Sequence, residues 1–334
     1  MQSQSSRFQA PSLKLTTHPP QSPHIIRAGV LGFCMGVRRA VKLAYAQADD
    51  SSERGYILGP LIHNPQVLED LKSRGMKMLD EFCLPEDLHG ASVVIRAHGV
   101  SPQIEAELRR RGAVITDATC PRVKASQLKA QALAESGYLL FLAGEKSHAE
   151  IAGILGYAEM GLRRRGDKLR ENALPCVVVG NVAEASAMAS RLAAEFDSKN
   201  TKVALIGQTT ISQEEYQAIS GEIATFFPYL EIARTICAAT GERQDSLREL
   251  LDRVEAVVVV GGKESANTRR LFAIAETAGK PCVLAETARD IPPGFSGFGT
   301  VGITAGASTP DTVIDSIERA LVFCTYRNSF RKTF

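Results

Sequence analysis

Short apolar segments alternate along this chain with segments whose apolar residues recur at helical spacing. The apolar runs are continuous rather than interrupted by polar residues, which is typical of strands buried on both faces. Because strand and helix alternate, the sequence predicts an α/β architecture with parallel sheets. The runs behind this prediction are 92–95, 113–115, 138–142, 177–179, 203–206 and 257–260, and helical patterns occupy segments such as 127–135 and 245–253.

Composition excludes several classes of protein. The 334 residues suffice for two or three domains, and 44% hydrophobic with 23% charged residues is ordinary for a globular chain. A net charge of +2 argues against nucleic-acid binding through a basic surface, and no apolar run approaches the ~18 residues of a membrane helix. Seven cysteines spread over so long a chain favour reduced thiols, so we predict a cytoplasmic protein without a membrane or nucleic-acid partner.

Residues 1–24 differ in composition from the rest of the chain. They contain four prolines and five serines but no acidic residue, and this composition predicts a disordered, dispensable tail. An organelle transit peptide is the alternative, but Arg7 is the only arginine in the segment, and such leaders are usually rich in arginine.

A weak threefold repeat organises the remaining chain. In each repeat a cysteine ends a predicted strand, a polar residue follows 28 or 29 positions later, and a second polar turn follows another strand. Because ligands bind beyond the carboxyl ends of parallel strands, these positions predict three pseudo-equivalent domains around one shared centre. The cysteines are Cys34, Cys120 and Cys237, the polar residues are His63, His148 and Ser265, and the turns are 97–101, 208–212 and 304–308.

The repeat also predicts where the domains begin and end. We predict domains at 25–121, 122–233 and 234–334, each a small parallel sheet flanked by helices, with the first strand able to pack in the third domain. The helices that open at the polar turns direct their N-termini towards the centre, which favours a negatively charged ligand there.

Three converging thiols can hold a metal centre. Iron–sulfur clusters prefer cysteine ligands, and tetrahedral zinc also accepts them. The chain has no CxxC motif, which counts against a zinc ribbon, so we favour a cluster; three ligands would leave one iron of a [4Fe–4S] cluster open. The other cysteines have apolar neighbours and are predicted to pack in the core: Cys83, Cys176, Cys282 and Cys324.

Three of the six histidines, His63, His98 and His148, fall at the polar positions of the repeat. A single buried histidine is usually structural, but three at equivalent positions favour ligand binding. Imidazoles beside helix N-termini suit a phosphate group. Glu150, two residues beyond His148, is a candidate proton carrier.

Nine ordered motifs resemble those of the 4-hydroxy-3-methylbut-2-enyl diphosphate reductase family, and the resemblance extends over residues 29–321. They are Gly-Phe-Cys-Met-Gly-Val from Gly32, Ile-His-Asn from Ile62, Ala-His-Gly-Val-Ser from Ala97, Asp-Ala-Thr-Cys-Pro from Asp117, Ser-His-Ala-Glu from Ser147, Gln-Thr-Thr-Ile-Ser from Gln208, Ile-Cys-Ala-Ala-Thr from Ile236, Ser-Ala-Asn from Ser265 and Thr-Ala-Gly-Ala-Ser from Thr304.

The resemblance implies a trefoil of three α/β domains around a central [4Fe–4S] cluster held by Cys34, Cys120 and Cys237. It also implies an activity: two electrons from an external carrier such as ferredoxin or flavodoxin convert (E)-4-hydroxy-3-methylbut-2-enyl diphosphate to isopentenyl and dimethylallyl diphosphate. Thr209 and Glu150 would lie near the substrate hydroxyl, with Glu150 as proton donor. The implied substrate-binding residues are His63, His98, His148, Thr209, Ser265, Ala266, Asn267 and Ser308.

Three positions depart from the family pattern. Ala149 replaces a proline, Ala238 replaces a tyrosine, and Ala266 replaces a serine, so that only the backbone N–H of Ala266 can serve a phosphate. Losing that serine hydroxyl would cost about 1–3 kcal/mol of binding unless another donor replaces it. Since no implied cluster ligand or proton donor is missing, we expect activity.

Two other functions stay open. A cluster-based dehydratase or isomerase would use the open iron on a small phosphorylated metabolite without net electron flow. A regulatory iron–sulfur or zinc module would not be an enzyme. His63, His98 and Glu150 would have no function in such a module, which argues against it.

Overall fold

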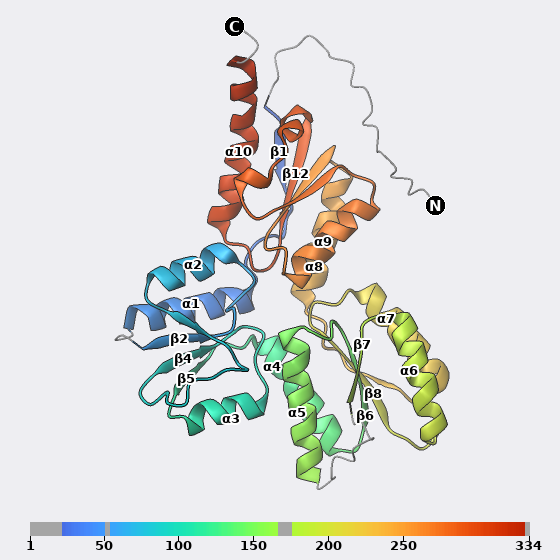
Figure 1. The fold of residues 1–334 in the computed structure, drawn as a ribbon. Helices are drawn as coiled ribbons and strands as arrows, with labels where there is room; N and C mark the ends of the chain where they lie inside the picture. The colour runs from blue at the N-terminus through green and yellow to red at the C-terminus, as the bar shows by residue number, and fades with distance from the viewer. Residues whose placement is uncertain (1–21, 51–53, 166–175, 331–334) are drawn as a thin grey trace, which may run out of the picture.

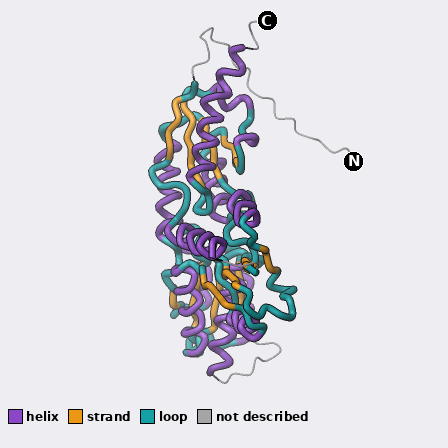
Figure 2. Tube along the Cα trace, turned by 90° about the vertical axis from the view of Figure 1, so that its left-hand side faces the viewer, coloured by secondary structure: helices purple, strands orange, loops and turns teal. Residues whose placement is uncertain are grey.

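The structure, a computed structural model, describes residues 22–50, 54–165 and 176–330. Three lobes spread from a common centre in Figure 1, and the view turned by 90° is narrower, so the lobes lie roughly in one layer (Figure 2). Each lobe is built on one four-stranded sheet, and all strand pairs among the described residues are parallel.

The first lobe, in blue and teal at the lower left of Figure 1, has the strand order β3-β2-β4-β5. Asn64 and Ser101 are the N-cap residues of its helices α2 and α3, and their side chains accept hydrogen bonds from N–H groups of the first turn. A proline follows each cap as the first helical residue. The elements are α1 (Met35–Asp50), β2 (Gly55–Leu58), α2 (Pro65–Ser73), β3 (Lys77–Leu79), β4 (Ser92–Ile95), α3 (Pro102–Arg110) and β5 (Val114–Asp117).

The second lobe, in green and yellow at the lower right, has the strand order β7-β6-β8-β9. Its elements are α4 (Pro121–Glu135), β6 (Leu139–Ala143), α5 (Ala149–Arg165), β7 (Cys176–Val179), α6 (Val182–Glu195), β8 (Val203–Gly207), α7 (Gln213–Phe226) and β9 (Glu231–Ile232).

The third lobe joins both ends of the described chain. β1 (His24–Arg27) pairs with β12 (Thr300–Ala305), which gives the strand order β1-β12-β10-β11. The other elements are α8 (Ala238–Leu251), β10 (Ala256–Val260), α9 (Ala266–Thr277), β11 (Cys282–Ala285), the 3₁₀ turns η1 (Ala288–Asp290) and η2 (Pro293–Gly297), and α10 (Asp311–Phe330).

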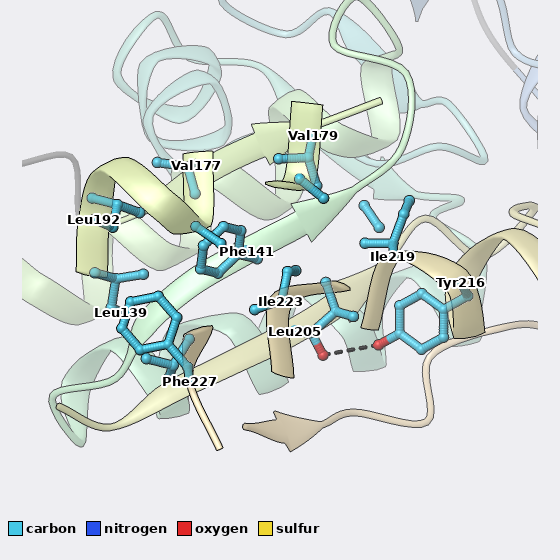
Figure 3. Close-up of a cluster of buried hydrophobic side chains, with 14 of the residues drawn as sticks. Leu139, Phe141, Val177, Val179, Leu192, Leu205, Tyr216, Ile219, Ile223 and Phe227 are labelled. Atoms are coloured by element: carbon cyan, nitrogen blue, oxygen red, sulfur yellow. Dashed lines mark hydrogen bonds between the residues drawn. The ribbon is translucent and has the colours of Figure 1, made fainter. Parts of the chain in front are cut away.

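Apolar side chains on both faces of each sheet form the cores. All five residues of β6 are buried: Phe141 packs with one cluster, while Leu140 and Leu142 belong to the cluster on the opposite face. Figure 3 shows the Phe141 side, where the hydroxyl of Tyr216 donates to the carbonyl of Leu205 over 2.9 Å. Two-sided burial is why these strands are continuous apolar runs.

The predicted fold class is confirmed: three parallel sheets flanked by helices are arranged as three lobes. The predicted domain boundaries stay a prediction, although each sheet lies between them apart from β1. The predicted tail lies outside the described residues as far as residue 21, and β1 begins at His24, inside the range assigned to the tail.

The core prediction for the remaining cysteines is correct for buried Cys176 and wrong for exposed Cys83. Cys83 lies in a turn after β3, where its N–H donates to the carbonyl of Asp80, and its apolar neighbour Phe82 is 91% exposed. Apolar neighbours in sequence do not imply burial when the segment is a surface turn. Cys282 is partly buried, and the side chain of Cys324 lies outside the described residues.

Within the described part of the chain, no helix combines the length and apolar character that a membrane crossing requires.

Candidate active site

One pocket at the centre of the three lobes gathers all the predicted site residues. Each follows the carboxyl end of a strand by two to seven residues, where parallel sheets place ligands. The pocket is lined by Cys34, His63, His98, Cys120, His148, Glu150, Thr209, Cys237, Ser265, Ala266, Asn267 and Ser308. Their roles are not settled by this proximity and stay predictions.

Backbone hydrogen bonds hold the three cysteine-bearing segments in equivalent ways. The N–H of each cysteine donates to a carbonyl in the second polar turn of another repeat, and that turn follows a strand in the same sheet as the strand before the cysteine. The bonds are Cys34 to Ala307 at 3.3 Å, Cys120 to Ala97 at 2.9 Å and Cys237 to Thr209 at 2.9 Å. The repeat seen in the sequence is therefore a repeated backbone arrangement around the pocket.

The donor set fits a [4Fe–4S] cluster. Cys120 and Cys237 are the N-cap residues of α4 and α8, and Cys34 directly precedes α1, so three positive helix ends face the thiols. The N–H of Val37 lies 3.5 Å from Cys34 Sγ, a donor of the kind that stabilises cluster sulfur. At Gly36 a Cβ would lie 2.4 Å from Cys120 Sγ, so only glycine leaves this sulfur its place.

Burial, the larger effect, raises the pKa of the Cys120 thiol, and the backbone N–H groups of Arg122 and Val123 oppose this by donating to the sulfur. Such donors favour the thiolate, the form that ligates metals. Three thiols and the open pocket between them match a cluster with three protein ligands.

The three histidines form a compact group in the same pocket. Their ring centroids are 4.8 Å apart for His63 and His98, 5.1 Å for His98 and His148, and 5.8 Å for His63 and His148. One nitrogen from each lies within 4.8 Å of the others, so the group has the geometry of a metal site as well as of an anion site.

Burial favours the neutral form of these three imidazoles. Desolvation is the largest cause of a lowered pKa at all three: His63 is lowered, His98 is well below its usual value, and His148 is lowered to about 4. The charges of His63 and His148 lower the pKa of His98 further. The N–H of Glu150 donates to Nδ1 of His148, which leaves Nε2 of His148 to carry the proton.

Several polar groups in the pocket have no protein partner among the described residues. These buried atoms are His63 Nε2, His98 Nδ1 and Asn267 Nδ2. Ser265, the N-cap of α9, accepts from the N–H of Thr268 at 3.3 Å, so its own hydroxyl hydrogen is free to donate. Buried polar groups are almost always paired in a folded protein, so this set is complementary to a ligand rich in acceptor oxygens.

Glu150 is buried, and its raised pKa lets it hold its proton at a higher pH than an ordinary carboxyl group does. Its side chain is 1% exposed, and burial raises its pKa to about 7 against the opposing hydrogen bonds from Thr209. The N–H of Thr209 donates to Oε1 at 2.7 Å, and the Thr209 hydroxyl donates to Oε2 at 3.0 Å. Ala149 begins α5 in place of the family proline, so the helix that positions Glu150 forms without it.

We expect diphosphate binding to be linked to protonation of these histidines. An anion beside neutral imidazoles raises their pKa, so binding at pH 7 should take up protons, up to about one per imidazole. Calorimetric titration of inorganic pyrophosphate in buffers of different ionisation enthalpy measures this uptake. His98→Gln should take up less than the wild type, whereas His89→Ala, at an exposed and remote position, should match it. Equal uptake by all three proteins would contradict this prediction.

Two arginines of the pocket were missed by the sequence analysis. Arg122, two residues after Cys120, is exposed at the pocket edge. Arg243 on α8 is buried, and its guanidinium donates to the carbonyls of Gly32 at 2.8 Å and Ala239 at 2.7 Å. Burial lowers its pKa, and the nearby charges of Cys34 and Cys237 oppose that shift. The available signal was their position within the first two turns of a helix that begins at a repeat cysteine.

The fold and the pocket define a class: a three-lobed α/β protein with one shared site that combines cysteines, histidines and a protonated carboxyl group. The model of the LytB protein family matches residues 25–322. The chain belongs to this family.

Relatives and solved structures agree with that assignment. A protein of Treponema pallidum (strain Nichols) is 45% identical over 320 residues, covering 89% of this chain and 83% of the relative. One from Aquifex aeolicus is 38% identical, covering 88% and 94%. Both are named 4-hydroxy-3-methylbut-2-enyl diphosphate reductase. The predicted family, and its standing as an enzyme family, are confirmed.

Two solved structures share the fold over most of the chain. The E-1-hydroxy-2-methyl-but-2-enyl-4-diphosphate reductase of Plasmodium falciparum has a TM-score of 0.77 at 25% identity, covering 89% of this chain and 87% of that chain. A structure of (E)-4-hydroxy-3-methyl-but-2-enyl diphosphate reductase has a TM-score of 0.64 at 37% identity, covering 90% and 99%.

Proposed function

We propose that this chain reduces (E)-4-hydroxy-3-methylbut-2-enyl diphosphate to isopentenyl and dimethylallyl diphosphate. The observation that carries this proposal is the composition of one pocket, where three cysteines, three histidines and buried Glu150 meet. Family membership supports the same reaction. The predicted cytoplasmic location stays a prediction.

The diphosphate is the binding handle in this proposal. The unpartnered nitrogens of His63, His98 and Asn267 supply donors to phosphate oxygens. Ser265 and Ala266 add the N-terminal end of α9, where the backbone N–H groups and the helix dipole favour an anion. Binding energy gained at the diphosphate orients the distant hydroxyl group for reaction. His148, Thr209 and Ser308 complete the proposed contacts.

Cys34, Cys120 and Cys237 would hold a [4Fe–4S] cluster. When bound, such a cluster would supply a Lewis acid and a path for single electrons from an external ferredoxin or flavodoxin. The chain's own part is to fix three thiolates at helix N-termini and to leave the pocket side open.

Glu150 and Thr209 transfer the proton to the substrate hydroxyl in this mechanism. Protonated Glu150 can reverse its 3.0 Å hydrogen bond and donate to the Thr209 oxygen, which frees the Thr209 hydroxyl hydrogen for the substrate. Burial keeps the proton on Glu150 up to about pH 7 and keeps the carboxyl group away from bulk water. The substrate hydroxyl then leaves as water rather than as hydroxide.

Anaerobic purification with iron and sulfide analysis, followed by product analysis, tests this function. Electron paramagnetic resonance of the reduced protein should change when substrate is added, and products should form only with a reductant. Turnover without reductant would favour a dehydratase or isomerase instead. A cluster with neither substrate response nor turnover would favour a regulatory module.

A further inference from the structure

The first helix presents an unusual surface beside a proposed cluster ligand. Met35 begins α1 directly after Cys34, and its side chain is 75% exposed. The buried face of α1 packs into the core of the first lobe through residues such as Ala40 and Ala44. Met35 lies on the other face, so its exposure serves no packing within the described residues. A single exposed apolar side chain is common on a protein surface, so the inference depends on the charges that share this face with Met35.

Three cationic side chains lie on the same face of α1 as Met35. Arg38, Arg39 and Lys42 are exposed and follow Met35 at helical spacing, so all four share one face of α1. Arg38 and Lys42 form no ion pair or side-chain hydrogen bond with any described residue, and α1 carries no acidic residue before Asp49. The chain as a whole has a net charge of only +2, so this is a local concentration of charge.

The surface extends to the second proposed ligand. Arg39 donates to the carbonyls of Thr119 at 3.1 Å and Asp117 at 3.2 Å, which ties α1 to the segment that carries Cys120. Arg122, exposed and likewise without an ion partner among the described residues, lies two residues beyond Cys120 at the pocket edge. We call the surface formed by Met35, Arg38, Arg39, Lys42 and Arg122 the α1 face.

We propose that the α1 face is the docking site of an acidic one-electron carrier protein. An apolar centre with a charged rim is the usual composition of a protein interface, and electron-transfer complexes are small. Complementary charge steers such partners and raises their association rate. This inference rests on the proposed function and gives its electron donor a location. The face abuts two cysteines, so a carrier bound there would lie close to the cluster.

The reaction consumes two electrons, so a one-electron carrier must bind twice in each turnover. Each reduced carrier gives up one electron and leaves oxidised. Two electrons and two protons together replace the C–O bond of the substrate with a C–H bond and release one water. A site that binds and releases the carrier quickly suits this sequence better than a large, stable interface.

The test compares two electron sources in one double variant. Arg38→Glu/Lys42→Glu should raise KM for a reduced acidic [2Fe–2S] ferredoxin roughly tenfold or more at low salt, because two attractive charges become repulsive. Turnover with reduced methyl viologen should stay within about twofold of the wild type, since neither residue lines the pocket. Salt should weaken the ferredoxin reaction of the wild type and should affect that of the variant much less.

Arg163→Glu is the matched control. Arg163 is exposed near the far end of α5, about 20 Å along the helix from Ala149, so its reversal should change neither reaction. An unchanged ferredoxin KM in the double variant would overturn the docking site while leaving the proposed function intact. Wild-type protein that turns over with viologen but not with ferredoxin would also overturn it. Absence of turnover with viologen would instead contradict the proposed function.

Discussion

Cys120→Ser is expected to lose both the cluster and the activity. A serine hydroxyl is a much poorer iron ligand than a thiolate, and Cys120 is one of the three cysteines that line the pocket among the described residues. The visible absorbance of the anaerobically purified protein, its iron and sulfide content and its turnover with reduced viologen measure this. We expect turnover to fall below detection and the same result for Cys34→Ser and Cys237→Ser.

Two other cysteines provide the controls. Cys282→Ser and Cys83→Ser change the same atom in partly buried and exposed positions outside the pocket. Both variants should keep wild-type iron content and turnover, and Cys282→Ser should cost at most some stability through lost packing. Loss of the cluster in Cys282→Ser together with its retention in Cys120→Ser would show that the ligand assignment is wrong.

Much of the fold could be predicted because the strands are buried on both faces. The runs at 92–95 and 257–260 lie within β4 and β10, and β10 is buried along its whole length. Continuous apolar sequence is what two-sided burial requires. β2, β3 and β11 are missing from the predicted runs. For β3 the reason is physical, because a segment of three residues with two of them exposed carries no apolar run.

The candidate site could be assembled from sequence because the repeat marks strand ends. The chemistry of the cysteines and histidines was readable in their motifs. Their convergence was predicted from the repeat as a whole, because three equivalent strand ends indicate one shared centre. The raised pKa of Glu150 could not be predicted, because it results from burial in the tertiary structure. The exposure of Met35 could not be predicted either, because it depends on which face of α1 packs against the sheet. For Cys83 the sequence predicted burial that the structure does not have, because its apolar neighbours belong to a surface turn.

Glu150→Gln is expected to lower kcat by roughly 10²–10⁴-fold, the usual range for loss of a general acid. The glutamine oxygen can still accept the 2.7 Å hydrogen bond from the Thr209 N–H, and its amide can donate to the Thr209 hydroxyl oxygen. The variant therefore keeps the shape of the site but has no transferable proton. Substrate binding should change little, because the proposed diphosphate contacts lie on other residues.

Stability gives a check that the variant is folded. The pKa of Glu150 is raised in the folded protein, from 4.5 to about 7, so the folded state holds its proton while the unfolded chain releases it. The folded state binds more protons between these values, and stability contributed by this group falls as pH rises across that window. Glutamine does not ionise, so Glu150→Gln should be no less stable than the wild type at pH 8 in thermal unfolding.

The pH profile separates proton donation from binding. The protonated carboxyl group is the active form, so wild-type kcat/KM should fall about tenfold per pH unit above about 7, and the residual activity of Glu150→Gln should lack this decline. His63→Ala and His98→Ala remove contacts made both before and during reaction, so they should raise KM more than they lower kcat. Steady-state kinetics with reduced viologen and a substrate-binding titration measure both effects. Near-wild-type turnover by Glu150→Gln, or loss of its substrate binding while the histidine variants retain theirs, would contradict the roles assigned here.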